Sequence, residues 1–463
     1  MDHFFFSEEI YIRRRRALKS KLKSGVYLFL GNDESSINFK DNWYHFRQDS
    51  TFLYYFGVNI PSLAAIIDID NDKEIIFGDT LTIDDIVWTG PLPSLKELGG
   101  KAGITTILPA NKLATYCDRN IKYLPPYRPE HTLKLNVLTG KPVKELEGSA
   151  DVSFIKAVVD QRSIKTEEEI EQLDLAATLS SEMHLRVMKS AEPGRKEHDL
   201  VAQAYKYAWS RYVHMSFTPI VTINGHILHN HDYSHQIERG NMVLFDGGIE
   251  VSSGYAGDMT RTFPVSESFS SIQAEMYDIV HHSFVSAVEA VKPGIRFKDI
   301  HLLAAKKLVE GLTAMSIMKG DPDEAVAAGA HTMFFQCGLG HMMGLDVHDM
   351  ENLGEQYVGY TERFCKSKEF GLKSLRLGKE LQQGYVLTVE PGIYIIPELI
   401  DLWHAEGKFR QFINYDVLNK YRNFGGIRIE NDYLVTSSGS RVLGDPLPVE
   451  RSAIERIRQE SLS

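Results

Sequence analysis

One short pattern recurs in the second half of the chain at a fixed offset of 100 residues, where Glu192-Pro-Gly194 returns as Lys292-Pro-Gly294. Proline cannot continue a helix and glycine readily adopts the left-handed conformation that ends one, so each copy is typical of a helix stop. A glycine-rich segment that carries histidine follows each copy, at residues 224–229 and 337–341. Either the match is chance or the second half is a duplicated unit. Duplication predicts pseudo-twofold symmetry with a functional site at the junction.

The chain has 463 residues, which is more than a single hydrophobic core usually serves. The first part alternates short β-rich runs with helical stretches, as α/β domains do. These runs are Val26–Leu30, Ala64–Ile69 and Glu74–Phe77. Thr166 and Glu169 then form a capping-box pattern that opens a long amphipathic helix. We therefore predict two domains, residues 1–160 and residues 161–463.

The formal net charge of −11 indicates an acidic surface, which repels nucleic acid and anionic membranes and excludes both as expected partners. The basic run Arg13–Arg16 is either a phosphate-binding patch or the solvated face of a helix, and the second reading is favoured. The three cysteines lack metal-binding spacing and suit a reducing compartment. Because the chain also shows no signal-peptide plan and no bilayer-spanning run, we expect a cytoplasmic protein.

Two predicted strands, Val243–Glu250 and Tyr255–Phe263, are separated by a short turn and should form a hairpin. Folding the hairpin brings Asp246 and Asp258 toward each other. A bare carboxylate is unfavourable in such apolar strands, and a bound cation removes that penalty. An ion pair with Arg261 would also remove it, and for either aspartate alone that reading is favoured.

Three further segments carry polar side chains in apolar surroundings. His341 lies on a glycine-rich segment, and Glu390 ends an apolar strand just before a Pro-Gly break. Glu430 shares a strand face with Arg428, because strand side chains alternate with a period of two. Considered singly, His341 could be a structural histidine, and Arg428 and Glu430 could form a buried ion pair. Both interpretations remain open at this point.

Together these segments supply four carboxylates and one imidazole, a hard ligand set. Such a set suits Mn²⁺ and tolerates Co²⁺, Zn²⁺ or Fe²⁺, whereas structural zinc favours cysteine. Five ligands exceed what one divalent ion needs, so we predict two ions about 3.5–4 Å apart that share a bridging water. The predicted ligands are Asp246, Asp258, His341, Glu390 and Glu430.

The ordered motifs FDGG, YAGDMTRTF, GLGHMMGLDVHD, TVEPGIY and GGIRIENDYLV resemble those of the Xaa-Pro metallopeptidases, the aminopeptidase P and prolidase group. Residues Phe46–Gly57 resemble that group's N-terminal domain, so nearly the whole chain is covered. The resemblance implies an α/β (α+β) protein: a pita-bread catalytic domain with pseudo-twofold symmetry, preceded by a smaller creatinase-like domain. It also implies that Asp258 and Glu430 bridge the ions.

By the same resemblance, Asp246 serves one ion, and His341 and Glu390 serve the other. One departure from the family stands out. Asp246 and Asp258 lie twelve residues apart, one more than the family's usual spacing. We expect the extra residue in the turn Ser252–Gly254, where it leaves the strand register intact. An insertion within a strand would turn one aspartate away from the site.

The implied activity is hydrolysis of Xaa-Pro bonds by a metal-activated water. Glu390 is the expected proton acceptor, and His348 the expected donor to the developing oxyanion. His229 matches the family's substrate-side histidine. A rival reading groups it with the neighbouring histidines at positions 226, 231 and 235 as an all-histidine metal cluster; the family pattern selects only His229.

Arg376 resembles the arginine with which prolidases hold the carboxylate of a C-terminal proline, a task that suits a guanidinium fork. Without the resemblance it reads equally well as a surface arginine. The expected substrate-binding residues are Arg376, Arg428 and His229. We therefore expect an Xaa-Pro dipeptidase, with an aminopeptidase P acting on longer peptides as the alternative. Trp88 resembles a prolidase tryptophan that reaches the partner subunit, which favours a homodimer.

A different class also has to be weighed: a non-catalytic pita-bread protein that binds a partner, since folds outlive their chemistry. Such a protein, like a creatinase-type amidinohydrolase, should lack part of the carboxylate set. All five ligand positions are filled here, which argues against both.

Overall fold

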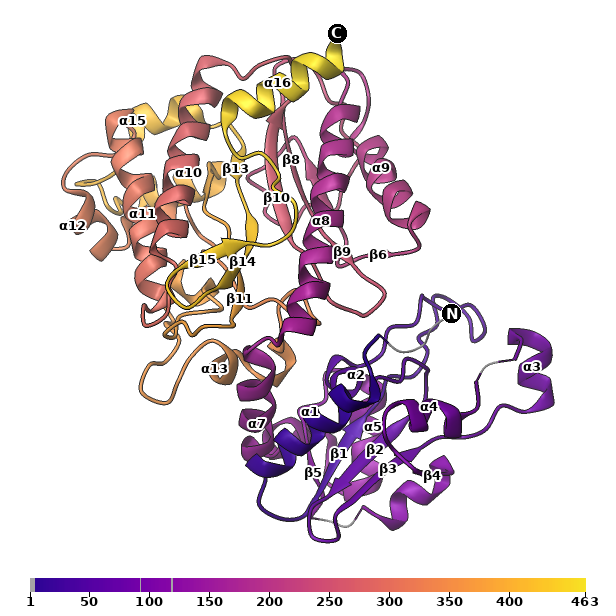
Figure 1. The fold of residues 1–463 in the computed structure, drawn as a ribbon. Helices are drawn as coiled ribbons and strands as arrows, with labels where there is room; N and C mark the ends of the chain where they lie inside the picture. Colours follow the sequence, from indigo (N-terminus) through magenta and orange to yellow (C-terminus); the bar gives the residue numbers. More distant parts are fainter. Residues whose placement is uncertain (1–4, 92, 118–119) are drawn as a thin grey trace. The chain divides into compact units, whose positions relative to one another are not determined.

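The computed structural model describes residues 5–91, 93–117 and 120–463, shown in Figure 1. The chain forms two compact units. The first unit comprises residues 1–162 with 350–357, and the second comprises residues 163–349 with 358–463. The short helix α13 (Glu355–Val358) begins in the 350–357 segment.

The first unit is built on a five-stranded mixed sheet in the order β4-β3-β2-β1-β5. Neighbours among β1, β2 and β3 run antiparallel, while β4 and β5 pair in parallel at the two edges. The strands are β1 (Val26–Leu30), β2 (Ala64–Asp68), β3 (Lys73–Phe77), β4 (Thr106–Leu108) and β5 (Lys122–Tyr123). The helices are α1 (Glu8–Lys21), α2 (Ser50–Phe56), α3 (Ile83–Thr89), α4 (Leu95–Lys101), α5 (Pro129–Thr139), α6 (Val143–Leu146) and α7 (Val152–Ser163).

The basic run Arg13–Arg16 in the middle of α1 is not simply a solvated helix face, so that expectation was wrong for half of it. Arg14 and Arg15 are buried. Their guanidinium groups donate to the carbonyl oxygens of Tyr54 and Tyr55 at 3.0 and 2.9 Å. These carbonyls lie in the last turn of α2, where a helix leaves acceptors unpaired and favours positive charge.

The second unit contains two three-stranded sheets, β10-β8-β7 and β11-β14-β15, together with two short ladders, β12-β13 and β6-β9. In Figure 1 the labelled strands of the two three-stranded sheets lie between α8 on one side and α10 and α11 on the other. The strands are β6 (His214–Met215), β7 (Ile220–Thr222), β8 (Met242–Gly247), β9 (Ile249–Glu250), β10 (Met259–Pro264), β11 (Val386–Val389), β12 (Gly392–Tyr394), β13 (Gly426–Arg428), β14 (Asn431–Val435) and β15 (Ser440–Val442). The helices are α8 (Glu167–Ser190), α9 (Glu197–Ser210), α10 (Ser271–Ala290), α11 (Phe297–Ala314), α12 (Pro322–Ala327), α14 (Pro397–Ala405), α15 (Tyr415–Leu418) and α16 (Arg451–Leu462).

The 100-residue recurrence extends to the hydrogen bonds of the backbone. Helices α8 and α10 end at equivalent positions, and Gly194 and Gly294 both have positive φ, at 90° and 85°. The Gly194 N–H donates to the Ile237 carbonyl at 2.8 Å, and the Gly294 N–H donates to the Leu381 carbonyl at 2.9 Å. The ends of α8 and α10 are therefore built alike, which favours duplication over chance.

None of the helices in the described residues is both long and apolar enough to cross a bilayer.

Three buried histidines of the second unit give the protein a defined response to acid. Burial lowers the pKa of His184 and His301 to about 3 and that of His331 to about 4. In the unfolded chain each would bind a proton below about pH 6.5. The unfolded state then holds more protons, so the free energy of unfolding falls as the pH falls through this window.

We predict that His301→Phe, which keeps a ring stacked on Phe335, reduces this loss. Between about pH 7 and about pH 5 the variant should lose about 2 kcal/mol less unfolding free energy than the wild type. Denaturant unfolding without added metal measures both. Equal losses would show that His301 is not kept neutral by the fold.

Candidate metal centre

The hairpin formed by β8 and β10 places both predicted aspartates on one side. The ladder is continuous from Met242 opposite Pro264 to Gly247 opposite Met259, and it resumes at Glu250 opposite Ala256. Asp246 pairs with Thr260, and Asp258 lies two residues before Thr260, so the side chains of Asp246 and Asp258 share a face. The register is the same on both sides of the gap, so the structure agrees with an extra residue in the turn, and its place relative to the family stays a prediction.

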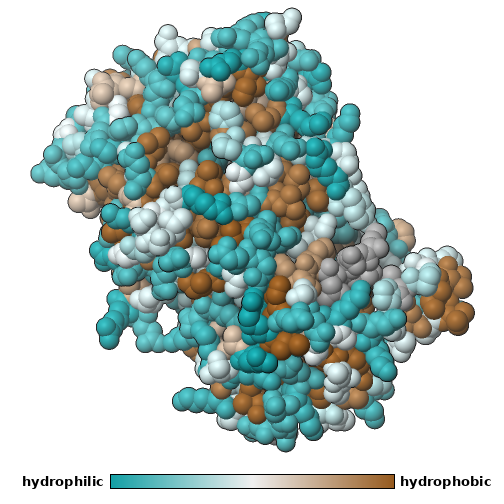
Figure 2. All heavy atoms as spheres, viewed as in Figure 1, coloured by the Kyte–Doolittle hydropathy of each residue, from teal (hydrophilic) through white to brown (hydrophobic). Residues whose placement is uncertain are grey.

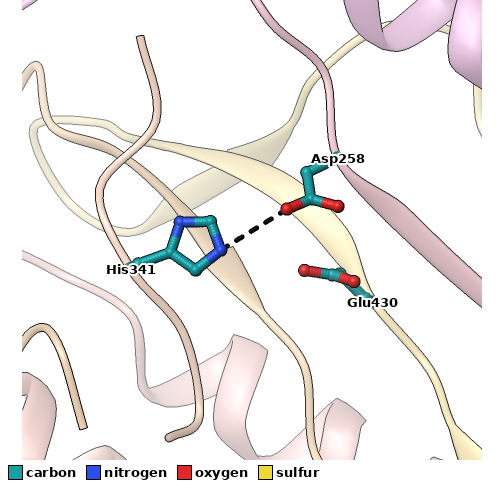
Figure 3. Close-up of side chains that lie close together, drawn as sticks. All are labelled: Asp258, His341 and Glu430. Carbon is teal, nitrogen blue, oxygen red and sulfur yellow. Dashed lines mark ion pairs between the residues drawn. The ribbon is translucent and has the colours of Figure 1, made fainter. Parts of the chain in front are cut away.

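Three ligands predicted from separate motifs meet at one point. Ligand atoms of Asp258, His341 and Glu430 all lie within 4.8 Å of one another, and all three residues are buried. Figure 3 shows the three side chains pointing toward a common centre, with the imidazole facing the Asp258 carboxylate. His341 Nε2 is 3.4 Å from Asp258 Oδ2 and 3.7 Å from Glu390 Oε1, so Glu390 borders the same centre.

Asp246, the fifth predicted ligand, lies beside this group and is paired with an arginine. Its Oδ2 accepts a hydrogen bond from Arg428 at 2.5 Å, and both residues are buried. Arg428 also donates to Thr260 Oγ1 and to the Tyr394 hydroxyl, at 3.0 and 2.9 Å. The buried ion pair of this region therefore joins Arg428 to Asp246 rather than to Glu430.

The alternative in which Arg261 neutralises an aspartate is excluded by the contacts of its guanidinium. Arg261 is fully buried and donates to four backbone carbonyls and to Asn431 Oδ1. Neither Asp246 nor Asp258 is among these acceptors. Arg261 thus ties the end of the hairpin to later chain segments.

The electrostatics of the centre call for a cation. Burial raises the pKa of Asp258 and of Glu430 well above the usual carboxyl values, and neighbouring carboxylates raise both further. The pKa of Glu390 rises to about 7, again mainly through burial, although the nearby Arg428 lowers it. Oδ1 of Asp246, Asp258 and Asp432 is buried without a hydrogen-bond partner. Divalent ions would neutralise this charge and occupy the Oδ1 atoms of the two predicted ligands Asp246 and Asp258, so the residues present fit a metal centre.

The imidazole of His341 is oriented for binding. Its Nδ1 lies 3.2 Å from the Met342 carbonyl, and donating a proton there leaves Nε2 to face the carboxylates as a ligand. Burial lowers the pKa of His341 well below its usual value, which favours the neutral form that binds metal.

Sequence reasoning missed several residues that contact the predicted ligands. The Thr260 hydroxyl donates to Glu430 at 2.6 Å. Thr388 Oγ1 accepts the His341 N–H at 3.1 Å, and Asp432 Oδ2 accepts the Asp258 N–H at 3.0 Å. Thr388 and Asp432 each lie two residues from a predicted ligand, so the period of two along a strand was a usable signal for both.

Of the predicted catalytic residues, His348 lies against the same centre. The His348 ring centroid is 4.4 Å from that of His341. Burial, and then the nearby positive charge of Arg428, lower the pKa of the half-buried His229; Arg376 acts on it in the same direction. The rival histidine cluster does not form among the described residues. His235 instead pairs with Glu197 at 2.8 Å, and the group of side chains close enough to hold a metal is Asp258, His341 and Glu430.

Comparison with known proteins gives consistent matches over most of the chain. The model of metallopeptidase family M24 matches residues 171–437, and that of the aminopeptidase P N-terminal domain matches residues 11–125. The Xaa-Pro dipeptidase of Homo sapiens is 33% identical over 461 residues, which cover 95% of this chain and 90% of that protein. A probable Xaa-Pro aminopeptidase of Fusarium vanettenii is 31% identical, covering 89% of this chain and 87% of that protein.

Among solved structures, the zinc-substituted aminopeptidase P of Escherichia coli in complex with product has a TM-score of 0.81 and 27% identity. The match covers 98% of this chain and 99% of that one. The expected fold class, a mixed α/β protein with an aminopeptidase-P-like N-terminal domain and a metallopeptidase domain, is confirmed.

We predict that Asp258→Asn stabilises the metal-free protein but abolishes most of its response to metal. Removing one carboxylate relieves buried repulsion, so the melting temperature without metal should rise. Wild-type protein should gain about 2.7 kcal/mol when the metal concentration is about a hundredfold above Kd, and the variant much less. Asp174→Asn, which breaks a surface pair with Arg441, is the matched control and should respond to metal as the wild type does. A full metal response in Asp258→Asn would contradict the assignment.

Proposed function

This chain belongs to metallopeptidase family M24 and is a metal-dependent Xaa-Pro peptidase, and we propose that its substrates are Xaa-Pro dipeptides. The observation that carries the proposal is the effect of Arg376 on residues of the proposed site. Its positive charge lowers the pKa of both Glu390 and His229, which supports a position of the guanidinium near the proposed base and the proposed substrate-side histidine. The name of the human relative, an Xaa-Pro dipeptidase, supports the same choice.

The proposed cofactor is a pair of divalent ions, with Mn²⁺ as the first candidate. The residues that would hold these ions are Asp246, Asp258, His341, Glu390 and Glu430. Support comes from the oxygen-rich ligand set, which suits Mn²⁺, and from four carboxylates, more than one divalent ion needs. When bound, such ions lower the pKa of water and polarise a scissile carbonyl.

The chain's own residues would carry the proton transfers. Glu390 takes the proton of the attacking water and passes it to the leaving proline nitrogen, which becomes a secondary amine. His348 donates a hydrogen bond to the developing oxyanion. His229 and Arg428 border the substrate, and Arg428 also holds Asp246 in place through their buried ion pair.

Arg376 would set the length of the peptide. In a dipeptide the proline carboxylate is free, and a guanidinium can bind it with two parallel hydrogen bonds. In a longer peptide that carboxylate is an amide, and the contact is lost. The alternative function is that of an aminopeptidase P, which acts on longer peptides. The likeness to the Escherichia coli enzyme supports this alternative.

We predict that Ala-Pro is hydrolysed in preference to Ala-Pro-Ala when Mn²⁺ is present, and that Arg376→Ala removes the preference. Loss of a charge-assisted contact should lower kcat/KM for Ala-Pro by about 10- to 100-fold. The tripeptide rate should change little. Lys373→Ala, which removes a nearby exposed cation, is the control and should retain the preference. A wild-type enzyme that prefers Ala-Pro-Ala would move the assignment to aminopeptidase P.

We also propose a homodimer, on the basis of α3. None of the side chains of α3 is buried, and Trp88, Ile83 and Val87 are 86%, 75% and 72% exposed. Figure 2 shows this helix at the right edge as a largely hydrophobic surface. A helix that exposes large apolar side chains is typical of an interface, and a second copy of the chain is the proposed partner.

Trp88→Glu is accordingly expected to shift the protein from dimer to monomer in sedimentation experiments, because it places a charge in a desolvated contact. Trp209→Glu, at an equally large but separate exposed tryptophan of α9, is the control and should leave the dimer intact. A dimer that survives Trp88→Glu would exclude α3 from the interface.

The proposed location is the cytoplasm, because sparse cysteines without metal or disulfide spacing suit a reducing compartment. A non-catalytic role remains the least supported reading, since no predicted ligand position has been lost.

A further inference from the structure

Two residues opposite each other on neighbouring strands each hold the backbone of a different proposed metal ligand. Thr388 of β11 pairs directly with Asp432 of β14 in an antiparallel ladder. Side chains of such a pair lie on the same face with their Cβ atoms about 4.5–5.5 Å apart. Both residues are fully buried, so neither interacts with bulk water.

The threonine side of the pair acts on the histidine ligand. Thr388 Oγ1 accepts the N–H of His341 at 3.1 Å, and it lies 3.5 Å from Glu390 Oε1, toward which its hydroxyl can donate. The Thr388 N–H also donates to the His341 carbonyl at 3.0 Å. This approach requires glycine at position 340, because a Cβ there would lie 2.0 Å from the Thr388 carbonyl oxygen.

The aspartate side of the pair acts on a proposed bridging ligand. Asp258 comes just before β10, so the β8–β10 ladder does not include it. Its N–H donates to Asp432 Oδ2 at 3.0 Å. Asp432 and Glu430 are two residues apart, so one face of the chain at β14 supplies the ligand Glu430 and also the group that holds Asp258.

We propose that Thr388 and Asp432 act together as positioning residues that fix the separation of His341 and Asp258, and so set the metal affinity of the centre. The inference rests on the proposed metal function and names residues that act through the ligands rather than on the substrate. Groups that orient metal ligands typically change metal affinity by about 10- to 100-fold when removed.

The test is the dissociation constant of Mn²⁺, measured by calorimetry on protein stripped of metal, together with the melting temperature of the stripped protein. Thr388→Val keeps the shape of the side chain but removes the hydroxyl, and Thr388→Ala repeats the loss without an added methyl group. Asp432→Ala removes the acceptor for Asp258. Each should raise Kd by about 10- to 100-fold.

Conservative variants separate positioning from packing and charge. Thr388→Ser keeps the hydroxyl, and Asp432→Asn keeps an acceptor oxygen while removing the charge, so both should bind Mn²⁺ within about threefold of the wild type. The control is Thr139→Val, which removes a buried hydroxyl of the first unit that donates to the Leu135 carbonyl. It should lower the melting temperature and leave Kd unchanged.

Three results would overturn the inference in different ways. Unchanged Kd with a lowered melting temperature in Thr388→Val and Asp432→Ala would leave the pair a purely structural role. If Asp432→Asn and Asp432→Ala weaken Mn²⁺ binding equally, the effect comes from the charge of Asp432 rather than from its hydrogen bond to Asp258. Wild-type protein that binds no Mn²⁺ would refute the proposed metal function itself, whereas a failure of the variants alone would not.

Discussion

The candidate centre depends on one contact that joins the two halves of the second unit. The Glu430 N–H donates to the Thr260 carbonyl at 3.1 Å, and the Thr260 hydroxyl donates back to the Glu430 carboxylate at 2.6 Å. These bonds fasten a ligand that follows β13 to the strand that follows Asp258. Arg261 also donates to the Glu430 carbonyl and so reinforces the contact between Thr260 and Glu430. Without this contact the hairpin and the later strands would hold their ligands separately.

The buried carboxylates near this contact are not all neutralised in the same way. Asp246 has a cationic partner in Arg428, while Asp258 and Glu430 face each other and His341, with no lysine or arginine paired to either among the described residues. Buried carboxylates without cations destabilise a fold, and proteins accept that penalty where function requires it. One carboxylate is thus neutralised by the protein's own arginine, and the need to neutralise the others supports the proposal that they hold divalent ions.

The clustering of Asp258, His341 and Glu430 could be predicted from sequence because each lies in a local pattern of strand end, glycine turn or hairpin. Their role as metal ligands stays a prediction. The partner of Arg428 could not, since the choice between Glu430 and Asp246 depends on which strands meet across the two halves. Arg14 and Arg15 were misread for a similar reason: their acceptors belong to a helix 40 residues later in the chain. Thr388 and Asp432 could have been identified from the sequence, because strand periodicity places them on the same strand faces as Glu390 and Glu430.

The division of the ligands between the halves has a consequence for the order of folding. Thr260 and Glu430 are 170 residues apart in sequence, so their contact closes a long loop, and such non-local contacts form slowly. Of the proposed ligands, the first half alone offers only Asp246 and Asp258, which is too few to retain an ion tightly. With this ligand set, a metal ion would be captured only after the contact between Thr260 and Glu430 has formed. Metal binding would then be a late step in the assembly of this unit rather than its starting point.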